Sequence, residues 1–138
     1  METPKAAFKL ISYSFDKVTI DNANFQDDEL LITFNPSGRF ENEKSQYDLK
    51  FLITTYNEDK KDNPYLSIEC NAVFKFENVS SFEEIPPFFY VNSIAILFPY
   101  VRAYVSLITT QAQVKGIILP TYNLSHLGDE LKENSINK

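Results

Sequence analysis

Residues 96–124, ILFPYVRAYVSLITTQAQVKGIILPTYNL, decide the C-terminal half of the fold. Between Pro99 and Gly116 no helix breaker occurs, and the segment predicts an amphipathic helix over 99–113. Pro99 either begins this helix or bends it, and Gly116 ends it. The apolar stripe of the helix consists of Val101, Tyr104, Val105 and Ile108.

The loop after Gly116 is apolar where a loop usually meets water. It reads Ile117-Ile118-Leu119-Pro120, with Tyr122 and Leu124 behind it. Two interpretations remain open and are compatible. The loop either folds back over the core, or it forms one wall of a hydrophobic groove.

The residues that follow predict a short last helix. Ser125 is a suitable N-cap, and Leu127 and Leu131 lie four residues apart on one helical face. The tail from about residue 133 is polar, and we expect it to fray.

Upstream of the helix, four segments read as strands: 7–20, 29–35, 47–56 and 65–76. In the first, alternation changes phase from Phe8 and Leu10 to Tyr13 and Phe15, then to Val18 and Ile20, which predicts a bulged strand. Asn35-Pro36-Ser37-Gly38 reads as a turn that ends the second strand. The fourth alternates strictly, so we expect an antiparallel sheet with one covered face.

This order of elements predicts one α+β domain over residues 1–138. A four-stranded antiparallel sheet is followed by a long helix, a crossover loop and a short C-terminal helix. Ser81 to Glu84 resembles a capping box that opens a short helical turn before Pro86 and Pro87.

Composition limits the function. A net charge of −6 argues against nucleic-acid binding, which depends on Lys and Arg contacts to phosphates. Cys70 is the only cysteine, so neither an intrachain disulfide nor a cysteine metal site can form. The N-terminus shows no signal-peptide pattern, and the apolar stretch around 85–101 falls short of a clean span of about 20 residues. We therefore expect a cytoplasmic protein that does not insert into membranes.

Catalytic motifs are missing as well. His126 is the only histidine, near a predicted helix start, where it more often serves as a surface or cap residue. The sequence has three glycines and no phosphate-binding glycine motif. Cys70 faces inward on a predicted strand, which favours an inert thiol. We expect no enzyme, no metal and no cofactor.

One segment resembles a known family. Ile96-Leu97-Phe98-Pro99-Tyr100-Val101-Arg102 is similar to the ILFPYAR segment of the SecB protein-export chaperones, with Val101 in place of Ala. A Gly, a Pro and an Asn before the last helix (Gly116, Pro120 and Asn123) also match. The resemblance extends loosely over residues 7–128.

The resemblance implies a homo-oligomer, a dimer of dimers, that holds unfolded polypeptides in long hydrophobic grooves without ATP. It places Pro99 in the helix that packs subunits together and the apolar loop beside the groove. Groove candidates are Phe34, Phe88, Phe89, Ile118, Leu119, Tyr122 and Leu127. Interface candidates are Ile94, Leu97, Tyr100, Val101 and Tyr104.

The family also docks on the motor protein SecA through an acidic outer sheet surface. Among the matched positions only Asp21 is acidic, while the others are Lys17, Tyr65 and Ser67. Three hypotheses follow: a general holdase for protein export, a SecB-like chaperone for one dedicated client such as an antitoxin, and an interaction module whose groove is closed. The module predicts that Ile118 and Leu119 are both packed.

Overall fold

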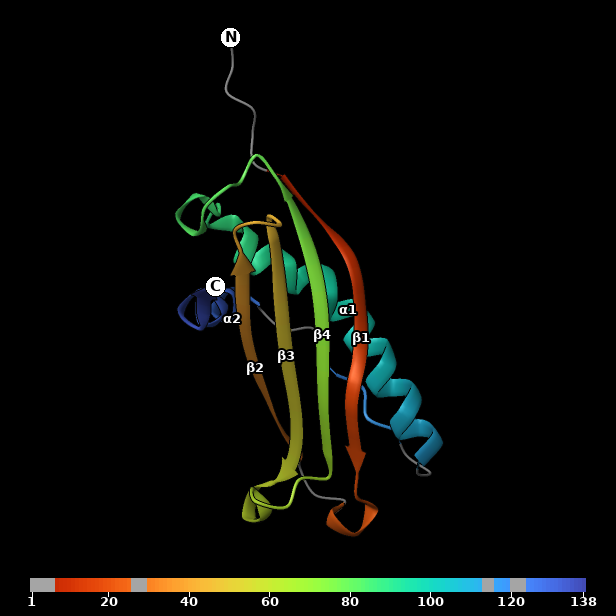
Figure 1. The fold of residues 1–138 in the computed structure, drawn as a ribbon. Coiled ribbons are helices and arrows are strands. Elements are labelled where there is room, and N and C mark those ends of the chain that lie inside the picture. The colour runs from red at the N-terminus through yellow and green to blue at the C-terminus, as the bar shows by residue number, and fades with distance from the viewer. Residues whose placement is uncertain (1–6, 26–29, 113–115, 120–123) are drawn as a thin grey trace.

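The computed structural model describes residues 7–25, 30–112, 116–119 and 124–138. They form one sheet with two helices behind it (Figure 1). Three short 3₁₀ turns, η1 (Asn22–Asn24), η2 (Glu58–Lys60) and η3 (Phe82–Glu84), connect the main elements. The strands are β1 (Ala7–Ile20), β2 (Leu30–Glu41), β3 (Gln46–Asn57), β4 (Leu66–Glu77) and β5 (Ser135–Asn137), and the helices are α1 (Phe88–Ala112) and α2 (Ser125–Glu133).

The sheet confirms the predicted antiparallel order. Its strands lie in the order β1-β4-β3-β2-β5, and the first four pair antiparallel. Two irregularities interrupt the pairing of β1 with β4, between Leu10 and Ser12 and between Phe15 and Lys17. They fall where the apolar phase changes, so the predicted bulges of this strand are confirmed.

The core lies between the sheet and α1. The inner face of β3 and β4 consists almost wholly of buried apolar side chains, as strict alternation requires. Phe89 at the start of α1 is fully buried, with its ring centroid 4.8 Å from those of Phe8 and Tyr47 and 4.7 Å from that of Phe76. Contacts between aromatic rings add to the burial of apolar area, so this cluster fixes one end of α1 on the sheet.

Several boundaries differ from the prediction. The helix begins at Phe88 and continues through Pro99, so Pro99 lies inside it rather than at its start. The predicted turn at 35–38 is wrong, because β2 runs through Pro36 to Glu41. Among the described strands, residues 30–37 of β2 pair only with β3, and such edge positions tolerate proline. At α2 the N-cap is Leu124 and not Ser125.

The C-terminal tail does not fray. Residues 135–137 form β5, which pairs parallel with Gly38 to Phe40 of β2. The Tyr47 hydroxyl, buried under this edge, is hydrogen-bonded to the Ser135 hydroxyl, which also donates to the Leu131 carbonyl at 2.6 Å. The backbone adds two hydrogen bonds to this edge, since the N–H of Gly38 donates to the Asn134 carbonyl at 3.3 Å and the N–H of Lys138 donates to the Phe40 carbonyl at 2.9 Å. Together these contacts hold the polar tail on the sheet.

Candidate functional site

A hollow of about 540 Å³ lies between the outward side of α1 and the crossover loop. We call it the α1 groove. Seven of its eight lining residues are uncharged, and the eighth is Arg102. The groove is lined by Ala95, Phe98, Pro99, Arg102, Ala103, Ser106, Ile118 and Leu124.

Helix α1 supplies the floor of the α1 groove, because residues three or four positions apart lie on the same side of a helix. Ala95, Pro99, Arg102 and Ser106 recur at intervals of three and four, so they share one face of α1. Two of these side chains are small, which leaves room above the helix. Pro99 has no N–H group, so the carbonyl of Ala95 lacks its usual helical donor. The floor therefore combines two small side chains with a proline, an arginine and one backbone carbonyl that lacks its usual helical donor.

The crossover loop supplies the wall. The N–H of Ile117 donates to Thr109 Oγ1 at 2.8 Å, and that hydroxyl donates to the Val105 carbonyl at 2.7 Å. Leu119 is fully buried, whereas Ile118 between them is 73% exposed. The loop is thus anchored on both sides of Ile118, by the hydrogen bond to α1 before it and by the buried Leu119 after it, and the Ile118 side chain is left on the surface of the groove.

Of the predicted groove residues, Ile118 lines the groove. Phe89, Leu119 and Leu127 are buried in the core, so the prediction that they line an accessible groove is wrong. Phe34 is partly buried and stacks on Phe51 at 5.5 Å. Phe88 is 49% exposed but does not line this hollow, and Tyr122 lies outside the described residues.

Sequence reasoning missed Phe98 and the small residues of the floor, whereas Leu124 belongs to the apolar segment that was predicted as a groove wall. The signal that could have found the floor is the interval of three and four residues around Pro99, from Ala95 to Ser106.

The predicted interface residues divide into two sets. Ile94, Leu97 and Val101 are fully buried within the chain, so they form core and have no surface for a second subunit. Tyr100 is 45% exposed and stacks on Tyr13 of β1 at 4.7 Å. Tyr104, partly buried, stacks on Phe15 at 3.9 Å.

Tyr100 belongs to a second outward stripe of α1, directed toward β1. Large exposed apolar side chains gather along this stripe and the neighbouring strand, and we call them the α1–β1 apolar face: Ile11, Tyr13, Ile96, Tyr100 and Leu107, each at least 40% exposed. Monomeric proteins seldom expose several large apolar side chains together, so this face resembles an interaction surface.

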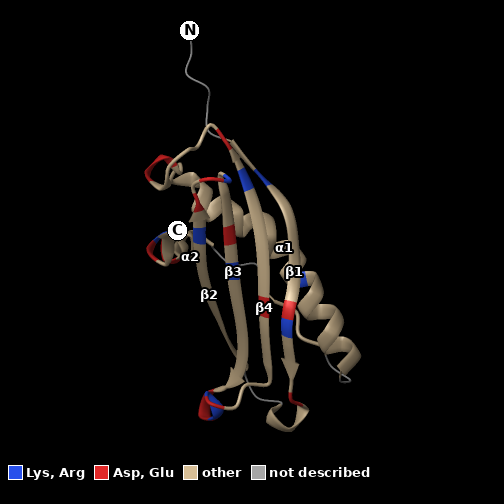
Figure 2. Cartoon of the chain, in the orientation of Figure 1, with Lys and Arg blue, Asp and Glu red and all other residues tan. Residues whose placement is uncertain are grey.

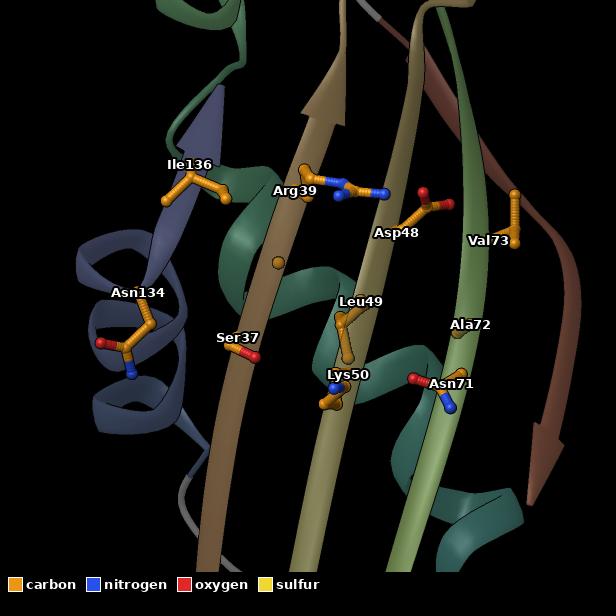
Figure 3. A pocket seen from close by; sticks show the side chains of 11 residues that line it. Ser37, Arg39, Asp48, Leu49, Lys50, Asn71, Ala72, Val73, Asn134 and Ile136 are labelled. Carbon is orange, nitrogen blue, oxygen red and sulfur yellow. The ribbon is translucent and has the colours of Figure 1, made fainter. Parts of the chain in front are cut away.

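The other face of the sheet is open and polar (Figures 1 and 2). Strands β1 to β4 carry five basic and five acidic side chains, which balance. A hollow of about 490 Å³ lies on this face, where Arg39, Asp48 and Lys50 project from neighbouring strands (Figure 3). Asp21 lies beyond the end of β1, and its carboxylate accepts from the N–H of Ala23 at 3.1 Å, so it caps the turn η1.

Cys70 is an inert thiol, as predicted. It is fully buried, and burial with the nearby Asp16 carboxylate raises the pKa of the thiol to about 12. The reactive thiolate is therefore scarce at neutral pH. Within the described ranges no three His, Cys, Asp or Glu side chains gather in a way that could hold a metal ion.

Helix α1 is longer than the sequence suggested. It continues through Pro99 and is 25 residues long in all. By length and composition alone it is the one described helix that could cross a membrane. The expectation that the apolar stretch is too short for a span is therefore wrong. Its apolar composition has another cause within this chain, since one stripe of α1 is buried against the sheet.

The fold and its groove define a SecB-like chaperone scaffold. A solved structure of the Mycobacterium tuberculosis Rv1957 SecB-like chaperone, in complex with a ChAD peptide from the Rv1956 HigA1 antitoxin, is similar to this chain with a TM-score of 0.62. The similarity covers 84% of this chain and 91% of that chain, at 15% identity. At such low identity the likeness shows a shared fold.

Sequence comparison then gives the family. Residues 14–133 match the family described as preprotein translocase subunit SecB, so this chain belongs to the SecB family. An uncharacterized protein of Methanocaldococcus jannaschii, MJ0357, is 29% identical over 146 residues, which cover 98% of this chain and 93% of that protein. SecB-family chaperones are not enzymes, and membership implies no catalysis.

Proposed function

We propose that this protein is an ATP-independent, cytoplasmic holdase that binds segments of non-native polypeptides in the α1 groove. The observation that carries the proposal is Ile118, an isoleucine 73% exposed beside an apolar hollow of about 540 Å³. Leaving such a side chain in water forgoes the free energy of its burial, and a bound apolar segment restores that burial. The closed-module hypothesis required Ile118 to be packed.

The binding mode follows from the shape of the groove. An extended segment can place apolar side chains between Phe98 and Ile118, while its backbone N–H groups face the Ala95 carbonyl. Burial of apolar area needs neither a cofactor nor ATP. The similar Rv1957 structure contains a chaperone with a peptide from an antitoxin. A dedicated client of this kind is the second candidate.

We propose further that the protein is a homo-oligomer, a dimer of dimers, in which the α1–β1 apolar face is covered by a second copy. Tyr100 and Tyr104 contribute to that contact, and Ile94, Leu97 and Val101 support it from within the core. Light scattering of Leu107→Ser, a change at a residue 59% exposed, should show a smaller particle than the unmodified protein. An unchanged mass would remove this face from the assembly.

Coupling to SecA has less support. An acidic docking surface is expected for that contact, whereas strands β1 to β4 carry equal numbers of acidic and basic side chains. The Asp21 carboxylate is engaged in capping its own turn. A direct binding measurement with SecA distinguishes general export from a dedicated client.

The first test of holdase function is aggregation of a chemically unfolded protein on dilution, followed by light scattering. The unmodified protein should suppress scattering, and Ile118→Ser should suppress it less. Ile136→Ser is the matched control, because Ile136 is also an isoleucine, 59% exposed, but lies on β5 at the open sheet face. No suppression at stoichiometric excess would sink the general holdase, and equal losses in both variants would remove the groove as its site.

A further inference from the structure

Helix α2 depends on its contacts with the rest of the chain. It has nine residues, and a helix of this length is not stable in water by itself. Leu127 and Leu131 are buried in the core. Gly128 lies against α1, where a Cβ atom would come within 2.8 Å of the Val91 Cα atom. These contacts dock one side of α2, while the chain beyond its last turn holds its C-terminal end.

Residues 134–138, which include β5, form a strap between α2 and the sheet, and we call them the C-terminal strap (Figure 3). The Asn134 side chain donates to the Pro36 carbonyl of β2 at 3.0 Å. The Ser135 hydroxyl donates to the Leu131 carbonyl of α2 at 2.6 Å. The strap is therefore bonded both to the last turn of α2 and to the strand β2.

The Tyr47 hydroxyl fixes the C-terminal strap from within the core. A hydroxyl has one hydrogen, and that of Ser135 is donated to Leu131, so the phenol supplies the hydrogen between Tyr47 and Ser135. The phenol reaches across β2 at Gly38, where a Cβ atom would lie 2.0 Å from its oxygen, so this position requires glycine. The Tyr47 ring also packs on Phe89 of α1 at 4.8 Å. One buried side chain thus connects α1, the sheet and the strap.

The other end of α2 contributes to the α1 groove. Leu124 is the N-cap of α2, and it lines the groove with Ile118. The Leu124 carbonyl accepts the N–H of Gly128 at 3.1 Å, which closes the first turn of the helix. Nine helical residues are only about 14 Å long, so one short, rigid element joins the strap to the groove wall. Leu124 keeps its place only while α2 stays docked.

We propose that the C-terminal strap positions the wall of the α1 groove through α2, with Tyr47 and Ser135 as positioning residues. The proposal rests on the proposed holdase function and names the segment that keeps its site assembled. Neither of the two side chains lines the groove, so their effect on binding passes through α2. When the strap is loosened, Leu124 loses its fixed place and a bound apolar segment loses buried contact area. Peptide affinity should therefore fall.

The test compares Ser135→Ala, which removes the hydroxyl, with Ser135→Thr, which keeps it. Hydrogen exchange of the α2 amides, that of Gly128 above all, should become about three- to tenfold faster in Ser135→Ala, as expected for the loss of one hydrogen bond. Affinity for an uncharged, apolar fluorescent peptide, measured by anisotropy, should fall by about threefold. Ser135→Thr should resemble the unmodified protein in both measurements. Amides in the middle of β4 are the internal reference, and their exchange should not change.

Tyr47→Phe tests the same hydrogen bond from the other side. It removes only the phenolic oxygen, and it should reproduce the effects of Ser135→Ala on α2 exchange and on peptide affinity. Tyr56→Phe is the matched control, because Tyr56 lies on the same strand but points to the open face of the sheet. This control should leave both measurements unchanged.

Unchanged α2 exchange in Ser135→Ala and Tyr47→Phe would overturn the proposal, and so would faster exchange with unchanged or higher peptide affinity. Equal acceleration in β4 would also overturn it, because the two hydroxyls would then stabilise the whole fold rather than the position of α2. Failure of the holdase itself is distinguishable, since then no peptide binds the unmodified protein. Peptide binding that Ile118→Ser weakens and Ser135→Ala leaves intact contradicts only the role of the strap.

Discussion

The inward and outward faces of α1 differ although they belong to one helix. The inward face presents Ile94, Leu97, Val101 and Val105, all fully buried on the sheet. The outward face presents small residues, an interior proline and one arginine beside the α1 groove. Stability therefore resides mainly in the first face, and the second carries residues that a helix selected for stability alone would not contain.

The largest effect is expected on the inward face. Leu97→Ala removes a fully buried side chain and leaves a cavity, so it should lower the free energy of unfolding by about 3 kcal/mol. Urea denaturation at fixed protein concentration measures the change. Ile96→Ala, at a neighbour 40% exposed, is the control and should cost less than about 1 kcal/mol. Similar losses in both variants would contradict the distinction between the faces.

Pro99→Ala should raise the free energy of unfolding, whereas Leu97→Ala lowers it. An interior proline is unfavourable in a helix by about 3 kcal/mol relative to alanine. Since Pro99 is exposed and alanine restores the donor to the Ala95 carbonyl, we expect a gain of about 2 kcal/mol in the free energy of unfolding. Thermal and urea unfolding test this, with the exposed Pro87 just before α1 as the control for substitution. A loss of stability would mean that the bend at Pro99 is required for packing.

Thr109 joins the two faces, because it is buried in α1 and also holds the crossover loop. Thr109→Val keeps the shape but removes the acceptor of the Ile117 N–H, so it should cost about 1 kcal/mol and loosen the groove wall. Hydrogen exchange of the Ile117 amide is the specific readout. Unchanged protection in the variant would show that the loop is held by Leu119 alone.

The smallest effect on stability is expected at Ile118. Ile118→Ser changes an exposed side chain and should alter the free energy of unfolding by less than about 0.5 kcal/mol. Peptide affinity should nevertheless fall. Should stability and binding instead fall together, Ile118 would belong to the core in solution and the comparison of faces would fail.

Much of this arrangement was predictable from sequence. The phase changes at Phe8, Tyr13 and Val18 predicted the bulges of β1, because side chains alternate with a fixed period of two. The long helix, the crossover loop and the short last helix were also predicted. The ILFPYVR segment predicts the SecB family, and the family match over residues 14–133 confirms it.

The sequence could not predict which apolar side chains of α1 are buried on the sheet and which remain on the surface. Leu97 and Tyr100 both looked like candidates for the subunit interface, yet one is core and the other is on the surface. Periodicity shows that a helix has an apolar face but not which of two partners covers it. The groove floor was missed for a related reason, since Ala and Ser give no hydrophobic signal. The strand at 135–137 was missed because its anchor, Tyr47, is distant in sequence.

The two bulges of β1 have a consequence for what can lengthen the sheet. They divide this edge into three runs of four paired residues. At each bulge the alternation of side chains between the two faces of the sheet shifts by one residue. A regular strand from another protein has no such shift, so it can align with only one run at a time. A run of four residues is shorter than an ordinary strand of about five to six residues. The irregular edge therefore disfavours the addition of further strands and so resists templated fibre growth.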